Sequence, residues 1–149
     1  MNTIASTKSQ KGVLLLEAMI AILLFSVGVL AVVGLQANAI KNVSQSKYRS
    51  DAAFLADQIL GQMWSDRTNI ATYAYPGGNS SNVTAWATQV QTTLPNATTP
   101  NAPTIVIAPQ AYAGPPSYTA YTVTITVKWK SPDESTAHQH VTTALITCC

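Results

Sequence analysis

The sequence predicts an α+β fold in which one long N-terminal α-helix packs, through its second half, on a small antiparallel β-sheet. A mostly apolar run from Val13 to Leu35 is followed by a stretch with three-to-four-residue apolar spacing that reaches Ser65. Further along, Tyr121 to Trp129 alternates apolar and polar side chains, which is the pattern of a strand with one packed face. We expect one helix through the first two stretches and one small head domain after them.

The apolar run from Val13 to Leu35 is long enough to cross a membrane once. As an α-helix it would span about 34 Å, which exceeds the hydrocarbon core of a typical bilayer. Its only strongly polar members are Glu17 and Ser26. Basic residues both precede and follow the run, so charge alone does not fix its orientation in the membrane.

The stretch after this run is amphipathic. Acidic and amide side chains separate its apolar positions, which favours a helix that buries one face. The apolar positions are Ala52, Ala53, Leu55, Ala56, Ile59, Leu60, Met63 and Trp64. Trp64, Trp86 and Trp129 all fall on apolar faces of predicted elements, so we expect all three tryptophans in the core.

The head is expected to hold a short helix and three strands. Residues 83–94 fit a helix that Pro95 stops. Residues 104–108 indicate a short strand, 121–129 give the strongest β signal, and 140–147 form its expected partner. The segments between these elements are rich in turn residues and are predicted to be loops.

Composition favours an exported structural domain over a cytosolic enzyme. Charged residues make up only 9% of the 149 residues. The net charge is +2. Without Lys8 and Lys11, the basic and acidic side chains are equal in number, so nucleic-acid binding is not expected. No serine, cysteine or histidine sits in a motif that pairs a nucleophile with its base. We therefore expect neither enzymatic activity nor a cofactor.

Glu17 is the one residue that a simple apolar helix does not explain. A charged side chain in hydrocarbon costs about 2.5 to 3.5 kcal/mol on insertion scales, so this carboxylate is expected to have a partner. It can be a helix-start carboxylate that its own helix dipole stabilises by about 0.3 to 1 kcal/mol. It can instead pair with a cation on another molecule.

The motif Lys11-Gly12-Val13-Leu14-Leu15-Leu16-Glu17, with the apolar residues that follow it, resembles the class III leader and helix start of type IV prepilins. The likeness continues to Met63 and is greatest to the minor pilins called type IV pilus modification protein, or PilV. Weaker similarity extends to Trp86, the Leu94-Pro95 pair and the strand 121–127. The resemblance implies the pilin-like form of the α+β fold.

By this resemblance, a prepilin peptidase cuts between Gly12 and Val13, and the new α-amine of Val13 is methylated. Glu17 then pairs with the terminal amine of a neighbouring subunit during assembly. An α-amine has a reference pKa of about 7.7 to 8, and opposite charges a few ångströms apart offset much of the cost of burying either. Glycine lets a protease hold the backbone closely, although Gly12 can also be a plain helix-boundary glycine.

The resemblance divides the chain into a leader over 1–12, a transmembrane and assembly half of the helix over 13–35, an amphipathic half over 36–66 and a periplasmic head over 67–149. It implies a minor pilin held in the inner membrane and then built into the pilus, at or near its tip. Expected partners are the prepilin peptidase, other minor pilins, the major pilin and, as a further candidate, a large tip adhesin. Gly34 stands where major pilins carry a proline, which favours a minor pilin or a pseudopilin over a major fibre subunit.

Two other functions fit parts of the sequence. A minor pseudopilin of type II secretion would share the leader, the acidic residue and the helix. A secreted binding domain would instead be released by signal peptidase after Ala39, because Ala37-Asn38-Ala39 has the small-x-small form of a cleavage site. The apolar run is longer than a usual signal-peptide core and contains an acid, which favours a pilin.

Two cysteines and two histidines near the end of the sequence are further candidates. Cys148 and Cys149 are adjacent, so they can form a strained vicinal disulfide, bond to another chain or stay as free or modified thiols. His138 and His140 would share one face of a strand.

Acidic residues at 133 and 134 precede these histidines. Together the four residues fall short of a recognisable metal signature. We therefore predict a solvated turn and no metal.

Overall fold

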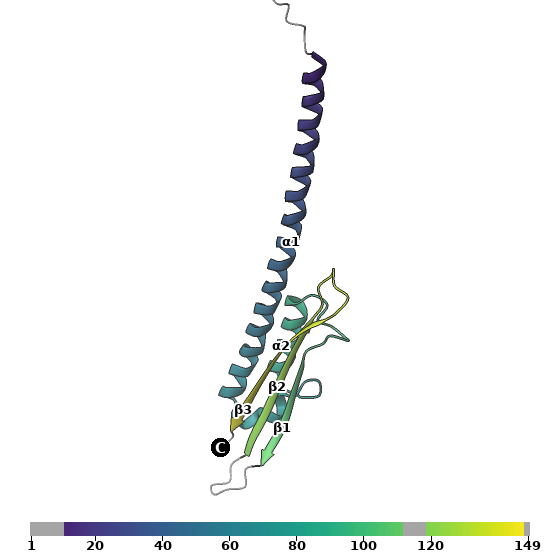
Figure 1. Cartoon of the computed structure of the whole chain (residues 1–149). Helices are drawn as coiled ribbons and strands as arrows, with labels where there is room; N and C mark the ends of the chain where they lie inside the picture. Colours follow the sequence, from purple (N-terminus) through teal and green to yellow (C-terminus); the bar gives the residue numbers. More distant parts are fainter. Residues whose placement is uncertain (1–10, 112–118, 148–149) are drawn as a thin grey trace, which may run out of the picture. The chain divides into compact units, whose positions relative to one another are not determined.

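The structure, a computed structural model, describes residues 11–111 and 119–147. The described chain forms two units, one up to Val43 and one from Ser44 onward. Helix α1, Lys11–Ser65, supplies the whole of the first unit and the start of the second (Figure 1).

The first unit is an apolar helix on which no other described segment packs. Every side chain from Gly12 to Val43 is exposed in the single chain. Among the described residues, α1 is the one helix long and apolar enough to cross a membrane. It continues without a break through Gly28 and Gly34. Apolar side chains gain free energy when they leave water, so lipid or other apolar helices are the expected surroundings of this surface.

The second unit adds five elements to the end of α1. They are the 3-10 helix η1 (Arg67–Tyr73), the helix α2 (Ser81–Thr93) and the strands β1 (Thr104–Ala111), β2 (Thr119–Trp129) and β3 (His138–Thr147). The strands form an antiparallel sheet in the order β1-β2-β3. The chain therefore visits the sheet from one edge to the other in sequence order.

Strand β2 lies at the centre of the sheet and decides which face is packed. Ile125 stands opposite Ile105 on β1 and Thr142 on β3. Successive side chains of a strand point to opposite faces, so the odd-numbered residues 123–129 share one face, and all of them are buried. The threonines between them lie on the other face, partly exposed.

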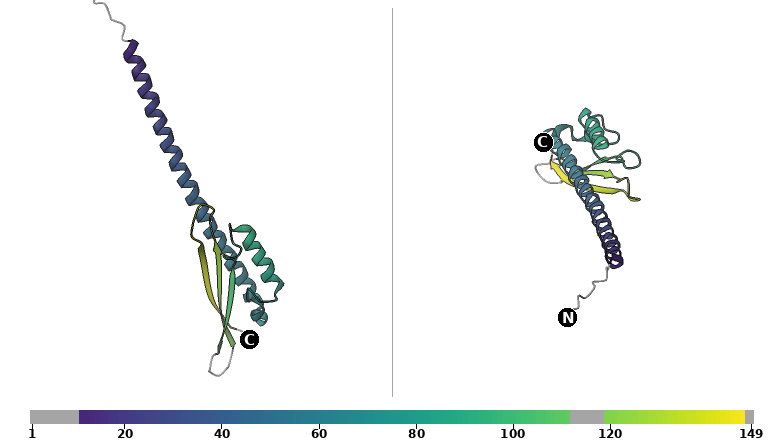
Figure 2. Two further views of the ribbon diagram at one scale, coloured as in Figure 1. Left: turned by 90° about the vertical axis from the view of Figure 1, so that its right-hand side faces the viewer. Right: turned by 90° about the horizontal axis from the view of Figure 1, so that it is seen from above.

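One hydrophobic core fills the space between this sheet face and the helices of the second unit. The second half of α1 and the helix α2 both cover that face (Figure 1, Figure 2). Trp86 on α2 donates its indole N–H to the backbone oxygen of Leu55 on α1 at 2.8 Å, which joins the two helices inside the core. The core residues are Ala52, Leu55, Ala56, Ile59, Met63, Ile70, Tyr73, Val83, Trp86, Ala87, Val90, Leu94, Ala97, Ile105, Val123, Ile125, Val127, Trp129 and Ile146.

The predicted α+β architecture, a long helix on a small antiparallel sheet, is confirmed. All three strands are longer than the sequence pattern indicates, and β2 begins at Thr119, two residues before the predicted start. β1 continues to Ala111 because its last residues keep pairing with β2 as far as Thr119, where a loop was expected. β3 begins at His138, opposite Trp129.

The prediction that all three tryptophans lie in the core is wrong for Trp64. Trp86 and Trp129 are buried, but Trp64 is 44% exposed. Met63 takes the core position on the last turn of α1, and adjacent helical residues are rotated by about 100° about the axis. Trp64 therefore falls at the margin of the buried stripe.

The segment after α1 is more ordered than the expected loop. Residues 67–73 form η1, which Ile70 and Tyr73 anchor in the core. The Tyr73 hydroxyl lies 3.2 Å from a carboxylate oxygen of Asp66 and donates to it. Asn69 also donates to the Asp66 carboxylate, and Thr72 donates to the backbone oxygen of Asn69. These local contacts, and not a regular apolar spacing, hold the segment in a helical conformation.

Replacing Ile125 by alanine is expected to lower the free energy of unfolding of the second unit by about 2 to 5 kcal/mol, because it removes buried carbon atoms from a packed core. The matched control is Thr124→Ala on the opposite face, for which we expect a loss below about 1 kcal/mol. Urea unfolding of the full chain in mild detergent, followed by tryptophan fluorescence, measures both. Equal losses would show that the two faces are assigned wrongly.

Candidate functional site

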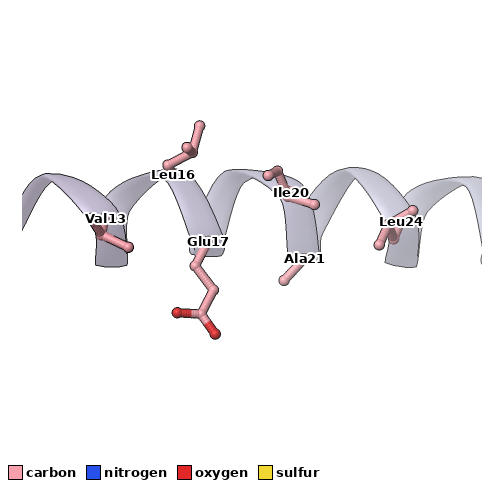
Figure 3. Close-up of a pocket in the computed structure, with 6 residues that line it drawn as sticks. All are labelled: Val13, Leu16, Glu17, Ile20, Ala21 and Leu24. Atoms are coloured by element: carbon pink, nitrogen blue, oxygen red, sulfur yellow. The ribbon is translucent and has the colours of Figure 1, made fainter.

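Glu17 lies on the outer surface of α1, surrounded by apolar side chains. Its carboxylate projects away from the helix, and Val13 and Ala21 lie one turn to either side on the same face (Figure 3). The exposed apolar surface around it is formed by Val13, Leu16, Ile20, Ala21 and Leu24.

The carboxylate of Glu17 has no partner within the described part of the chain. None of the side-chain hydrogen bonds or ion pairs there involves it. The first turn of α1 contains no acidic residue, because the helix begins at Lys11 and Glu17 lies in the second turn. Stabilisation by the helix dipole falls off within the first turn. The helix dipole therefore does not account for an acid at this place.

Gly12 is not required by the local structure. It is the second residue of α1, and a Cβ atom built on it would meet no atom within 4 Å. An alanine would have enough space at this position. Neither packing nor backbone conformation therefore explains a glycine here. Val13, the next residue, is 62% exposed.

Of the two pairs of candidate residues near the end of the sequence, the structure describes the histidines but not the cysteines. Cys148 and Cys149 lie outside the described residues. His138 and His140 both lie on β3, opposite Trp129 and Val127, so their side chains share the packed face of the sheet.

Glu134 and His138 are bonded through their side chains, and Glu134 also reaches α1. His138 Nε2 lies 2.5 Å from Glu134 Oε2, and the side-chain amide of Gln45 on α1 donates to the other oxygen of the same carboxylate. The His138 ring stacks on Trp129 with 5.7 Å between ring centroids. The turn between β2 and β3 is thereby fastened to both the sheet and the helix.

These residues do not assemble a metal centre. Asp133 is exposed, whereas Glu134 is partly buried and bonded to His138. His140 Nε2 lies 3.0 Å from the hydroxyl of Thr142. Across residues 11–111 and 119–147, no group of three or more histidine, cysteine or acidic side chains could hold a metal ion.

Comparison with known proteins adds no relative. No protein-family model, curated protein or solved structure matches this chain. The residues that bear on function are therefore those of the N-terminal motif, with Glu17 as the one charge on an apolar surface that has no partner among the described residues.

Replacing Glu134 by alanine is expected to destabilise the second unit by about 1 to 3 kcal/mol, because it leaves the donors of Gln45 and His138 without their acceptor. Asp133→Ala removes the same charge from the adjacent exposed position, and we expect a change below about 0.5 kcal/mol. Urea unfolding of the full chain in detergent compares the two variants. A similar loss in both would mean that the carboxylate acts only through the net charge of the turn.

Proposed function

We propose that this chain is a minor pilin of the type IV pilus system. A prepilin peptidase cuts it between Gly12 and Val13, residues 13–35 hold it in the inner membrane with the head in the periplasm, and assembly then moves it into the pilus at or near the tip. The unpartnered carboxylate of Glu17 carries this proposal, together with the motif in which it lies.

An acid in an apolar segment needs a cation at its own depth. Among the described side chains, no Lys, Arg or His forms an ion pair with Glu17. Cleavage after Gly12 creates a cation at nearly the same depth in the membrane as Glu17, because the new α-amine on Val13 lies one helical turn from the acid along the chain. The same amine on an adjacent subunit can reach Glu17 if the two helices lie side by side with a small axial offset.

Two features of α1 support cleavage that keeps the apolar run on the mature chain. Gly12 has no packing role, so its lack of a side chain is compatible with close binding of the backbone by a protease. The large side chains that follow are exposed on all sides of the helix. Such a surface suits a helix that is surrounded by lipid before assembly and by other helices after it. By the resemblance, those helices belong to other minor pilins and to the major pilin.

The mature protein isolated from the producing cell is expected to begin at Val13 and to carry one added methyl group, as measured by intact mass. Gly12→Ala should block cleavage and leave the leader attached, because the peptidase requires a residue without a side chain there. Gly28→Ala, at a glycine with equal space around it, should be processed normally. A mature N-terminus at Ile40 would instead identify a secreted domain released after Ala39.

Replacing Glu17 by glutamine is expected to reduce incorporation of the subunit into filaments at least about tenfold. The substitution leaves a buried ammonium without its counter-charge, and breaking one side of a buried pair costs about 3 to 5 kcal/mol. Asp57→Asn is the matched control, because it removes one carboxylate from an exposed position of the same helix. Quantitative detection in sheared pili, normalised to the membrane level, compares them. Equal incorporation of E17Q and the unaltered chain would refute the pairing.

A further inference from the structure

We infer that the second unit holds a binding pocket for a phosphate group, between α1 and the start of β3. A hollow of about 270 Å³ lies there. It is lined by Arg49 of α1, by Trp129 of β2 and by His138, Gln139 and His140 of β3. This site is separate from Glu17 and does not rest on the proposed pilus function.

The polar side chains of this pocket are hydrogen-bond donors of the kind that bind anions. Arg49 is exposed and forms no ion pair within the described part of the chain. A guanidinium carries five N–H donors and accepts no hydrogen bond, and the side-chain amide of Gln139 can donate two more. No aspartate or glutamate lines the hollow. The Glu134 carboxylate next to His138 is already bonded to His138 and Gln45. The donors of Arg49 and Gln139 at the hollow favour an anion over a cation.

The two imidazole rings are already held in place. His138 is fixed by its bond to Glu134 at 2.5 Å and by stacking on Trp129. His140 is oriented by Thr142, whose hydroxyl lies 3.0 Å from its Nε2 atom. Side chains ordered before binding lose less conformational entropy when a ligand arrives. The protein thus holds both rings in position without any ligand.

A tetrahedral phosphate suits this arrangement better than a planar carboxylate. The donors come from a helix on one side and from a strand on the other, so they are not confined to one plane. Arginine binds phosphate oxygens in pairs through its planar fork. The hollow also has room for a phosphate group with part of the molecule that bears it.

A second polar hollow in the same unit lacks this selectivity. It has a volume of about 320 Å³ and is lined by both Lys130 and Glu134, among other residues. The two opposite charges favour neither an anion nor a cation. The pocket at Arg49 differs because every ionisable side chain that lines it is basic.

Histidine ring resonances provide a direct test, because the chain has two histidines and both line the pocket. The full chain is prepared in a phosphate-free non-ionic detergent and titrated with inorganic phosphate at constant pH and ionic strength, with chloride as the balancing anion. We expect both ring signals to shift and to saturate in the low millimolar range. A linear drift without saturation would overturn the proposal.

Two variants separate a built site from general attraction between charges. Arg49→Gln should weaken phosphate binding at least about tenfold, which corresponds to about 1.4 kcal/mol. Lys47→Gln removes an equal charge two residues before Arg49 on the same helix. Lys47 does not line the pocket, so this variant should change the phosphate affinity less than about twofold. Equal weakening by both would show that only net charge matters, and the site would be rejected.

The same resonances distinguish a free phosphate from a lipid headgroup. The full chain is placed in nanodiscs of phosphatidylcholine, with or without phosphatidic acid, and no phosphate is added. Shifts that appear only with phosphatidic acid and are lost in R49Q identify a phosphomonoester headgroup as the ligand. Shifts that appear only on adding inorganic phosphate identify a soluble ligand. No shift under either condition would overturn the proposal.

Discussion

A single carboxylate on an apolar helix surface is the constraint on which the proposed function of this chain depends. Glu17 is surrounded by Val13, Ala21 and leucine or isoleucine side chains, and it makes no bond to any described residue. An ion in hydrocarbon is stable only with a counter-charge at the same depth. A helix that served only as an anchor would be more stable with leucine at this position, so the acid implies a partner supplied from elsewhere.

The same helix meets two different physical requirements along its length. Up to Val43 its side chains are exposed all around and mostly apolar, as suits a segment with apolar surroundings on every side. From Ala52 to Met63 only one stripe is buried, and that stripe completes the core beneath the sheet. The hydrogen bond from Trp86 to Leu55 and the bond from Gln45 to Glu134 fasten this second part to the head. The core of the head is therefore completed by the second half of α1.

The parts of the fold that the sequence predicts are those whose periodicity is long and regular. Alternation in β2 identifies its buried residues correctly, from Val123 to Trp129. The helix η1 and the exposure of Trp64 are not predicted, because both depend on contacts between residues in three dimensions. Ile70 and Tyr73 hold η1 in the core. Met63 takes the core position next to Trp64 and leaves Trp64 at the margin.

Site prediction follows the same division. Glu17 and Gly12 stand out in sequence because they contrast with adjacent residues. The pocket around Arg49 gives no such signal, since its basic residues lie on two elements far apart in the chain, and a count of charges finds no cluster. The bond between Glu134 and Gln45 likewise joins residues 89 positions apart.

The position of Glu17 also limits what its pairing can contribute to assembly. Cleavage would place the new amine of Val13 one turn from the acid on the same helix, so a single subunit in the membrane can already neutralise the charge internally. In the proposed function, assembly then carries both charges into apolar surroundings, where their pairing offsets the cost of burying them and adds little net gain, although either charge left alone there would be costly. Burial of the apolar surface around Glu17 must therefore supply most of the affinity. The pair fixes the axial offset, because only one offset between two helices brings an amine level with an acid.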